Sequence, residues 1–299
     1  MFVVLGASGH TGQVVAENLL ERGQKVRVVG RSADRLQNLA SKGAEVFVAD
    51  ATDAPALTKA FRSADAAYVL IPPNPTSSDY RGYQDHISDA IAAAVQNSGI
   101  KRVVSLSSFG ADKASGTGPV VGLYNLEQKL KQIEGTNVLS LRAGYFMENT
   151  LPQVAVVRML GSMAGPVRAD LKLPMIATRD IGKAAADALL SGDFRGQQTR
   201  ELLGQRDLDY KDLAAIIGKA IGKASLGYVQ APDEQLRGAM VQMGMSPNMA
   251  DLILEMAGAL NSGHMKALEP RSAKNSTATT FEKFVEEEFA PAYREQVAA

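Results

Sequence analysis

The stretch VVLGASGHTGQVVAENLL, residues 3–20, decides how this chain folds. An apolar run is followed by Gly6, Gly9 and Gly12, spaced three residues apart, and then by an amphipathic helical pattern. Glycine permits a tight turn, and the start of a helix presents free N–H groups and partial positive charge to a pyrophosphate. Placed between a first strand and a helix, the triplet predicts a dinucleotide-binding turn. The residues expected to contact the dinucleotide are Gly6, Ser8, Gly9, His10, Thr11 and Gly12. For His10, a solvent-facing position at the helix start is an equal alternative.

Strand and helix patterns alternate along the first 142 residues. The expected strands are short, apolar and rich in β-branched residues, and they lie at 2–5, 25–30, 45–49, 66–71, 102–107 and 137–142. The helical patterns between them lie at 13–22, 34–42, 54–62, 80–98 and 119–134. Such runs are typical of strands buried on both faces of a parallel sheet. The alternation predicts an α/β fold, a Rossmann-type doubly wound parallel sheet with right-handed crossovers.

The end of the second expected strand indicates which dinucleotide binds. An NAD site usually has Asp or Glu there to hold the ribose 2′-hydroxyl. This chain has VVGRSADR, which brings Arg31, Ser32 and Arg35 to that place. Guanidinium groups suit a 2′-phosphate, and one charge-assisted contact is worth about 1.5–3 kcal/mol. We therefore expect NADP(H) to be preferred over NAD(H). The alternative is that both arginines are solvated residues of a first helical turn.

Two further turns are expected to line the cofactor. Asp50, followed by Ala51 in FVADATD after the third strand, is a plausible partner for the adenine amino group. The IPPNP turn after the fourth strand lies where the strand order of the sheet reverses. Its backbone should pass over the middle of the cofactor at Ile71, Pro72 and Pro73.

The pattern changes after residue 150. A returning helix is expected at 178–192, capped by Asp180, and the chain then becomes mostly helical with strand-like pieces at 199–203 and 226–230. We therefore predict an NADP(H)-binding Rossmann domain at 1–150, completed by the returning helix. A smaller, mostly helical substrate or partner lobe at 193–299 would lie beside the carboxyl edge of the sheet.

The bulk composition narrows the classes of function. Lys plus Arg and Asp plus Glu number 32 each, so no basic patch indicates nucleic acid as a partner. The chain has no cysteine, and its three histidines lie far apart, so we expect neither thiolate chemistry nor a metal site. The N-terminus lacks a secretory signal, and no apolar run approaches the about 20 residues that cross a bilayer. A cytoplasmic protein is expected.

The segment LYNLEQKLKQ, residues 123–132, bears on catalysis. A tyrosine with its ordinary pKa of about 10 donates a proton poorly. A nearby cation, usually a lysine at i+4, lowers that pKa and makes the tyrosine a better acid. Here Tyr124 has Gln128 at i+4, and Lys129 lies one step off that face. Carbonyl reduction is therefore in doubt, and a sugar-nucleotide or steroid epimerase or dehydrogenase would need the missing pair. Tyr124 is otherwise a half-buried aromatic residue.

Quinones and cationic dyes are different acceptors, because hydride addition gives a delocalised anion or a neutral product that needs little general acid. A pocket that holds them flat could suffice through proximity and orientation. Flat or soft walls are expected from Phe109, Tyr145, Phe146 and Met147, and in the lobe above from Met159, Met163, Met240, Met243 and Met245. Plain core positions are the alternative for these methionines. Asn149 is the expected polar anchor, and Lys113 is a candidate mobile cation.

The segments GASGHTG, GRSADR, VADATD, LIPPNP, VSLSSFGA, LRAGYFMEN and ATRDIGKAAADAL together resemble the NmrA-like branch of the atypical short-chain dehydrogenases. The resemblance covers nearly the whole chain. It implies cofactor contacts from the glycine turn, Arg31, Asp50 and the 71–73 turn. It also implies that Ser107–Phe109 and Tyr145–Asn149 form the walls near the nicotinamide. The catalytic lysine that related reductases of the isoflavone type carry early in the helix at 119–134 has no counterpart in register here.

Two functions remain open at this point. The first is an NADPH-dependent reductase that transfers hydride to a quinone-like or other conjugated small molecule without flavin or metal. The second is a non-catalytic NADP(H)-sensing regulator that acts through a protein partner. The resemblance permits both, and the sequence leaves open whether the chain forms a homodimer.

Overall fold

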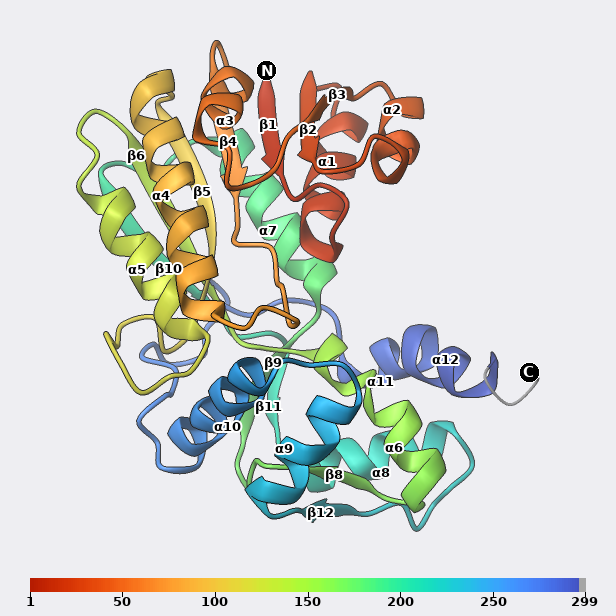
Figure 1. The fold of residues 1–299 in the computed structure, drawn as a ribbon. Coiled ribbons are helices and arrows are strands. Elements are labelled where there is room, and N and C mark those ends of the chain that lie inside the picture. The colour runs from red at the N-terminus through yellow and green to blue at the C-terminus, as the bar shows by residue number, and fades with distance from the viewer. Residues whose placement is uncertain (296–299) are drawn as a thin grey trace.

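The computed structural model describes residues 1–295 and contains the expected doubly wound sheet (Figure 1). Within these residues, seven parallel strands lie in the order β10-β6-β5-β4-β1-β2-β3. They are β1 (Phe2–Leu5), β2 (Val26–Gly30), β3 (Glu45–Val48), β4 (Ala66–Val69), β5 (Arg102–Ser108), β6 (Asn137–Ala143) and β10 (Gln197–Leu202). The first six agree with the predicted ranges to within two residues. Because the order reverses between β1 and β4, the carboxyl ends of these strands open a crevice where such sheets bind ligands.

Helices cover both faces of the sheet (Figure 1). One face packs against α3 (Ala54–Phe61), α4 (Tyr80–Ser98) and α5 (Val120–Lys131), and the other against α1 (His10–Glu21), α2 (Gln37–Ser41) and α7 (Thr178–Ser191). Helix α4 buries an apolar stripe of Ile87, Ile91, Ala94 and Val95 against the sheet. That helix ends at Gly99, whose positive φ of 71° favours glycine.

Strand β10 differs from the expected organisation. The sequence assigned the strand-like piece at 199–203 to the smaller lobe, but β10 pairs in parallel with β6 at the edge of the main sheet. The reason is that α7 packs along α1 and returns the chain to the free edge of β6. Leu202 then becomes buried while the first half of the strand stays exposed. The domain division at residue 193 otherwise stays a prediction.

A second group of elements comes after β6 in the chain and lies below the sheet in Figure 1. Its helices are α6 (Gln153–Leu160), α8 (Tyr210–Ala220), α9 (Asp233–Gln242) and α10 (Pro247–Asn261). Its short strands are β7 (Tyr145–Phe146), β8 (Met163–Gly165), β9 (Leu173–Ile176), β11 (Arg206–Leu208) and β12 (Tyr228–Gln230), of which only β12 was expected. Strands of two to four residues are too short to give a clear periodicity. Residues 296–299, the end of the predicted lobe, lie outside the described residues.

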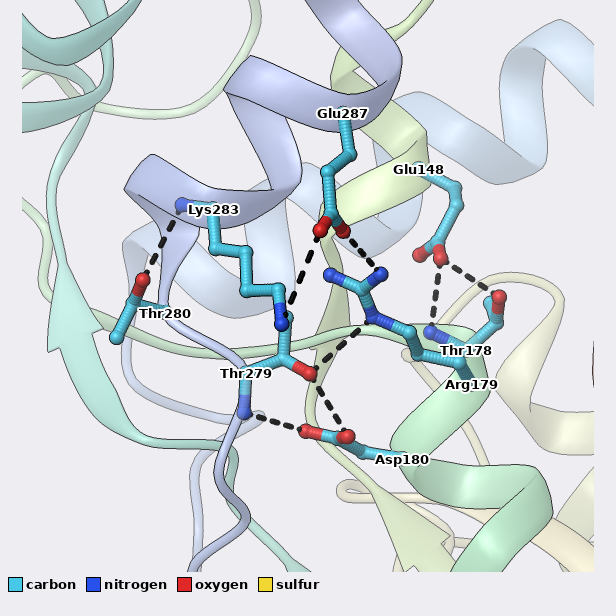
Figure 2. A network of polar contacts seen from close by, with 8 residues as sticks. All are labelled: Glu148, Thr178, Arg179, Asp180, Thr279, Thr280, Lys283 and Glu287. Atoms are coloured by element: carbon cyan, nitrogen blue, oxygen red, sulfur yellow. Dashed lines mark hydrogen bonds and ion pairs between the residues drawn. The ribbon is translucent and has the colours of Figure 1, made fainter.

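The C-terminal segment is fastened to the start of α7 (Figure 2). Asp180 was predicted to cap α7, but it lies inside the first turn and accepts hydrogen bonds from Thr279 N–H and Oγ1 at 3.0 and 2.8 Å. Glu148 takes the capping role, since its Oε1 accepts from Thr178 N–H and Oγ1 at 2.8 and 2.6 Å. Arg179 pairs with Glu287 beside them. The expected cap was wrong because the carboxylate that caps α7 comes from a segment 30 residues earlier.

Candidate functional site

The glycine turn has the geometry of a phosphate-binding loop. Gly6 has a φ of 70°, and a Cβ on Gly12 would lie 2.3 Å from the Gly6 carbonyl oxygen, so both positions require glycine. Helix α1 begins directly after Gly9, and no side chain caps it. The free N–H groups of its first turn therefore face the crevice above β1 and β4. Below the turn, Tyr68 donates a hydrogen bond of 3.0 Å to Thr11, which is buried.

A small pocket of about 70 Å³ lies beside this turn. Of the predicted cofactor residues, Gly6, Arg31, Asp50, Ala51 and Pro72 line it; Leu5, Val29, Gly30, Ala49 and Tyr83 were not predicted. The Thr52 N–H and hydroxyl donate to Asp50, and together with the charge of Arg31 they lower its pKa. The negative charge of Asp50 is thus held in place at the pocket wall, where it can accept a hydrogen bond.

A much larger cavity of about 580 Å³ adjoins the small pocket and shares Gly6 and Pro72 with it. The sequence prediction named just over half of its lining: Gly6, Gly9, His10, Thr11, Ile71, Pro72, Pro73, Ser107, Ser108, Phe109, Tyr145, Phe146, Glu148 and Asn149. The two turns and the segment after β6 thus meet in one place, as expected from strands whose carboxyl ends share one edge of the sheet.

Several predicted site residues do not line either pocket. Ser8, Gly12, Arg35, Lys113, Tyr124 and Met147 are all outside the lining. Gly12 lies beneath the turn, Met147 is core, and Lys113 forms an ion pair of 2.8 Å with Asp112. On α5, it is Leu123 and not Tyr124 that faces the cavity, which fits the alternative reading of Tyr124 as a half-buried aromatic residue.

The rest of the cavity lining escaped the sequence analysis. It comprises Leu70, Tyr80, Gln84, Leu106, Pro119, Val120, Leu123, Gly144, Thr178, Met249, Met256 and Met265. The methionine walls expected at 159, 163, 240, 243 and 245 were wrong, since none of those residues lines the cavity. Met159 and Met243 are exposed and Met163 is core. The spacing of seven between Met249 and Met256, which places both on one face of α10, was the available signal.

A buried ion pair lies directly behind Ser107. The Ser107 hydroxyl donates to Glu127 at 2.6 Å, and Arg142 donates to both oxygens of Glu127 at 2.9 and 2.7 Å. Glu127 is 1% exposed and Arg142 8%. The hydrogen bonds that Arg142 donates to Glu127 raise the pKa of Arg142 above its usual value. Because the Ser107 proton points to Glu127, the serine offers only lone pairs to the cavity.

Two tyrosines, Tyr80 and Tyr145, line the cavity, and Tyr145 is a weak acid. Its hydroxyl lies 3.3 Å from that of Tyr210, whose ring stacks on Tyr228 with centroids 4.2 Å apart. Burial raises the pKa of both Tyr145 and Tyr210. The hydrogen bonds of Tyr145 with Tyr210 and Asn149 lower its pKa only in part, and no lysine or arginine lines the cavity in the part of the chain that the structure describes. The arrangement does not favour proton donation by tyrosine.

Charge at the cavity wall is sparse. Glu148 is its carboxylate, and the lining contains no cation other than what His10 can carry on protonation. Residues 1–295 contain no group of three His, Cys, Asp or Glu side chains arranged for a metal. Over the same residues, no helix is both long and apolar enough to span a membrane. The cavity therefore suits an uncharged or cationic, largely apolar molecule.

The sheet order, the glycine turn and the adjoining pockets define a Rossmann-type protein of the class that binds dinucleotides at this crevice. The model of the NmrA-like family matches residues 1–288, and the chain belongs to this family. The resemblance inferred from the sequence is thereby confirmed.

One protein of similar sequence and two solved structures of similar fold cover most of this chain. The chain is 24% identical over 259 residues to the Prestalk A differentiation protein A of Dictyostelium discoideum, covering 85% of this chain and 80% of that protein. The NADPH-dependent quinone oxidoreductase QOR2 of Escherichia coli, in complex with NADPH, superposes with a TM-score of 0.82 and 24% identity, covering 97% of this chain and 100% of that one. The triphenylmethane reductase of Citrobacter sp. in complex with NADP(H) superposes with a TM-score of 0.80 and 18% identity, covering 96% of this chain and 99% of that one.

Proposed function

We propose that this protein is an NADPH-dependent reductase that transfers hydride to uncharged or cationic conjugated small molecules, such as quinones. The observation that carries this proposal is the large apolar cavity that opens beside the phosphate-binding turn and has no lysine or arginine in its described wall. The names of the similar quinone and triphenylmethane reductases support it.

The residues present fit a bound NADPH. The turn at Gly6–Gly12 would present its free N–H groups to a pyrophosphate, and its tight shape depends on glycine at position 12, where a Cβ would clash with the Gly6 carbonyl. The small pocket would take the adenosine, with Arg31 beside its 2′-phosphate and Asp50 as an acceptor for the adenine amino group. The nicotinamide would then lie in the large cavity near Ser107 and Tyr145. The cofactor supplies the hydride, and the proposal needs neither flavin nor metal.

The chain's own residues would act mainly by binding and orientation. Phe109, Tyr145 and Phe146 give flat walls against which a conjugated ring can lie, and the methionines of α10 close the opposite side. An apolar wall excludes water from the hydride, and alignment alone can contribute several kcal/mol to a rate. Since hydride addition to a quinone or cationic dye needs no strong acid, the raised pKa of Tyr145 is no obstacle.

The lining also separates this function from the other candidates. Sugar nucleotides carry a diphosphate, and burying an anion without a paired cation is unfavourable. A protein that only senses NADP(H) has no need of an acceptor site. The part of the cavity lined by Leu123, Met249 and Met256 lies outside the proposed cofactor residues and would leave room for an acceptor, which supports turnover.

Mixing the protein with NADPH and a panel of acceptors, while following NADPH absorbance, tests this proposal. We expect consumption with quinones and cationic dyes and none with uridine diphosphate sugars. Gly9→Asp, which puts a carboxylate at the phosphate site, should abolish it. Tight NADPH binding without consumption of any acceptor would instead favour the sensing protein.

A further inference from the structure

The acceptor end of the cavity contains a buried amide whose oxygen has no partner. Gln84 lies on α4, one turn after Tyr80, and both residues line the cavity. Gln84 is 2% exposed, and its Nε2 donates a hydrogen bond of 2.9 Å to the carbonyl of Pro119. Its Oε1 is buried and accepts nothing from the residues that the structure describes. An unsatisfied buried acceptor is costly, so a donor is expected to complete it.

We propose that Gln84 recognises the acceptor molecule and that this molecule carries a hydroxyl or amino group, whose hydrogen Oε1 accepts. This inference rests on the proposed reductase function and names the substrate class within it. A conjugated ring bearing such a donor would be held at one edge by Gln84. A ring whose edge presents only oxygen lone pairs would face the lone pairs of Oε1 and lose that contact.

The packing around Gln84 indicates a prepared position and not a chance gap. A Cβ on Gly122 of α5 would lie 2.3–2.6 Å from the three heavy atoms of the Gln84 amide, so only glycine there leaves space for this side chain. The bond to Pro119 fixes the nitrogen and thereby settles which amide atom is the free acceptor. The last torsion turns Nε2 and Oε1 together, so Oε1 stays where the bond to Pro119 places it, and the donor of the ligand would have to reach that position.

Gln84 and Tyr80 of α4 are the polar side chains of this end of the cavity, and Gln84 is the one with an unpaired acceptor. Pro119, Val120, Leu123, Met249 and Met256 line the same cavity with apolar surface. Ser107 lies near the end of β5, and Glu148 and Asn149 follow β6. A hydrogen bond in an apolar surrounding discriminates strongly, because a ligand without the donor leaves the protein group unpaired. Gln84 is thus a specificity-determining residue rather than a proton donor.

The test compares two acceptors that differ only in one donor. A methylamino-naphthoquinone has one N–H, and its dimethylamino counterpart has none, while their electronic properties are close. With the intact protein and NADPH, we expect kcat/KM to favour the methylamino compound by about tenfold. The Gln84→Met variant, of similar shape, should reduce this ratio to about that of the two compounds' intrinsic reactivity, while Gln84→Glu, which keeps oxygen acceptors, should retain the preference.

A matched control comes from the same pair of helices. Asn125 of α5 donates to Asp85 of α4 at 2.9 Å, next to Gln84 in the chain but outside the cavity lining. Asn125→Leu should leave the ratio unchanged, and all variants should bind NADPH with equal affinity by fluorescence titration. Equal rates for both compounds in the intact protein would overturn the inference and leave the reductase standing. No reduction of either compound would overturn both.

Discussion

Breaking the buried ion pair of Glu127 and Arg142 should destabilise the protein strongly, because of how the two side chains are buried and bonded. Arg142 makes two hydrogen bonds to Glu127, at 2.9 and 2.7 Å, and Glu127 also accepts from Ser107 at 2.6 Å. Both charges are almost fully removed from water. Glu127→Leu would leave the guanidinium buried and unpaired, which costs about 3–5 kcal/mol. The free energy of unfolding of a native domain is only about 5–15 kcal/mol, so this loss is a large part of the stability.

Urea unfolding of the two single variants and the double variant measures this coupling. We expect Glu127→Leu and Arg142→Met each to lower the midpoint strongly at an unchanged slope. The double variant should lose less free energy of unfolding than the two single variants lose together, by about 2 kcal/mol or more. The reason is that neither charge is then buried without its partner. Strictly additive losses would show that the two side chains do not depend on one another, and the account of the site behind Ser107 would be wrong.

Three further predictions concern the cofactor turn and the effect of pH. Arg31→Asp should weaken NADPH binding by about 10- to 100-fold while changing NADH binding little, and calorimetry showing an equal loss for both would count against the 2′-phosphate assignment. Gly12→Ala puts a Cβ 2.3 Å from the Gly6 carbonyl and should abolish binding of both dinucleotides, which tight NADPH binding by the variant would disprove. Burial and the neighbouring Glu148 raise the pKa of Glu288 above 4.5, so its favourable protonated form is lost as pH rises through that raised value. Glu288→Gln should therefore gain stability over the natural protein at neutral pH and gain less near pH 4, and melting curves with a pH-independent difference would refute this.

The parts that the sequence predicted well are those determined by local patterns. A glycine triplet between an apolar run and a helical pattern predicts the turn at Gly6–Gly12, because the turn depends only on the local backbone conformation of these residues. Strands buried on both faces form continuous apolar runs, so β1 to β6 could be placed to within two residues. Since parallel strands end at one edge, the residues after them could be expected to meet there, and many of them line the same cavity.

The parts that were missed depend on contacts between distant segments. Glu127 and Arg142 lie on a helix and on the strand after it, and nothing in either pattern indicates that they pair. Glu148 caps a helix that begins 30 residues later. The sequence correctly predicted a helix around Tyr124. The rotation of α5 that turns Leu123 towards the cavity depends on its packing against α4. Such rotations depend on the summed packing of both helices and not on one motif.

The proposed function depends above all on the binding of NADP(H) at the turn after β1. Calorimetric titration of the protein with NADPH and with NADH tests it directly. We expect one site per chain, occupied by NADPH about 10- to 100-fold more tightly than by NADH. Absence of heat and of competition for both dinucleotides would contradict the cofactor assignment and, with it, the proposed reductase.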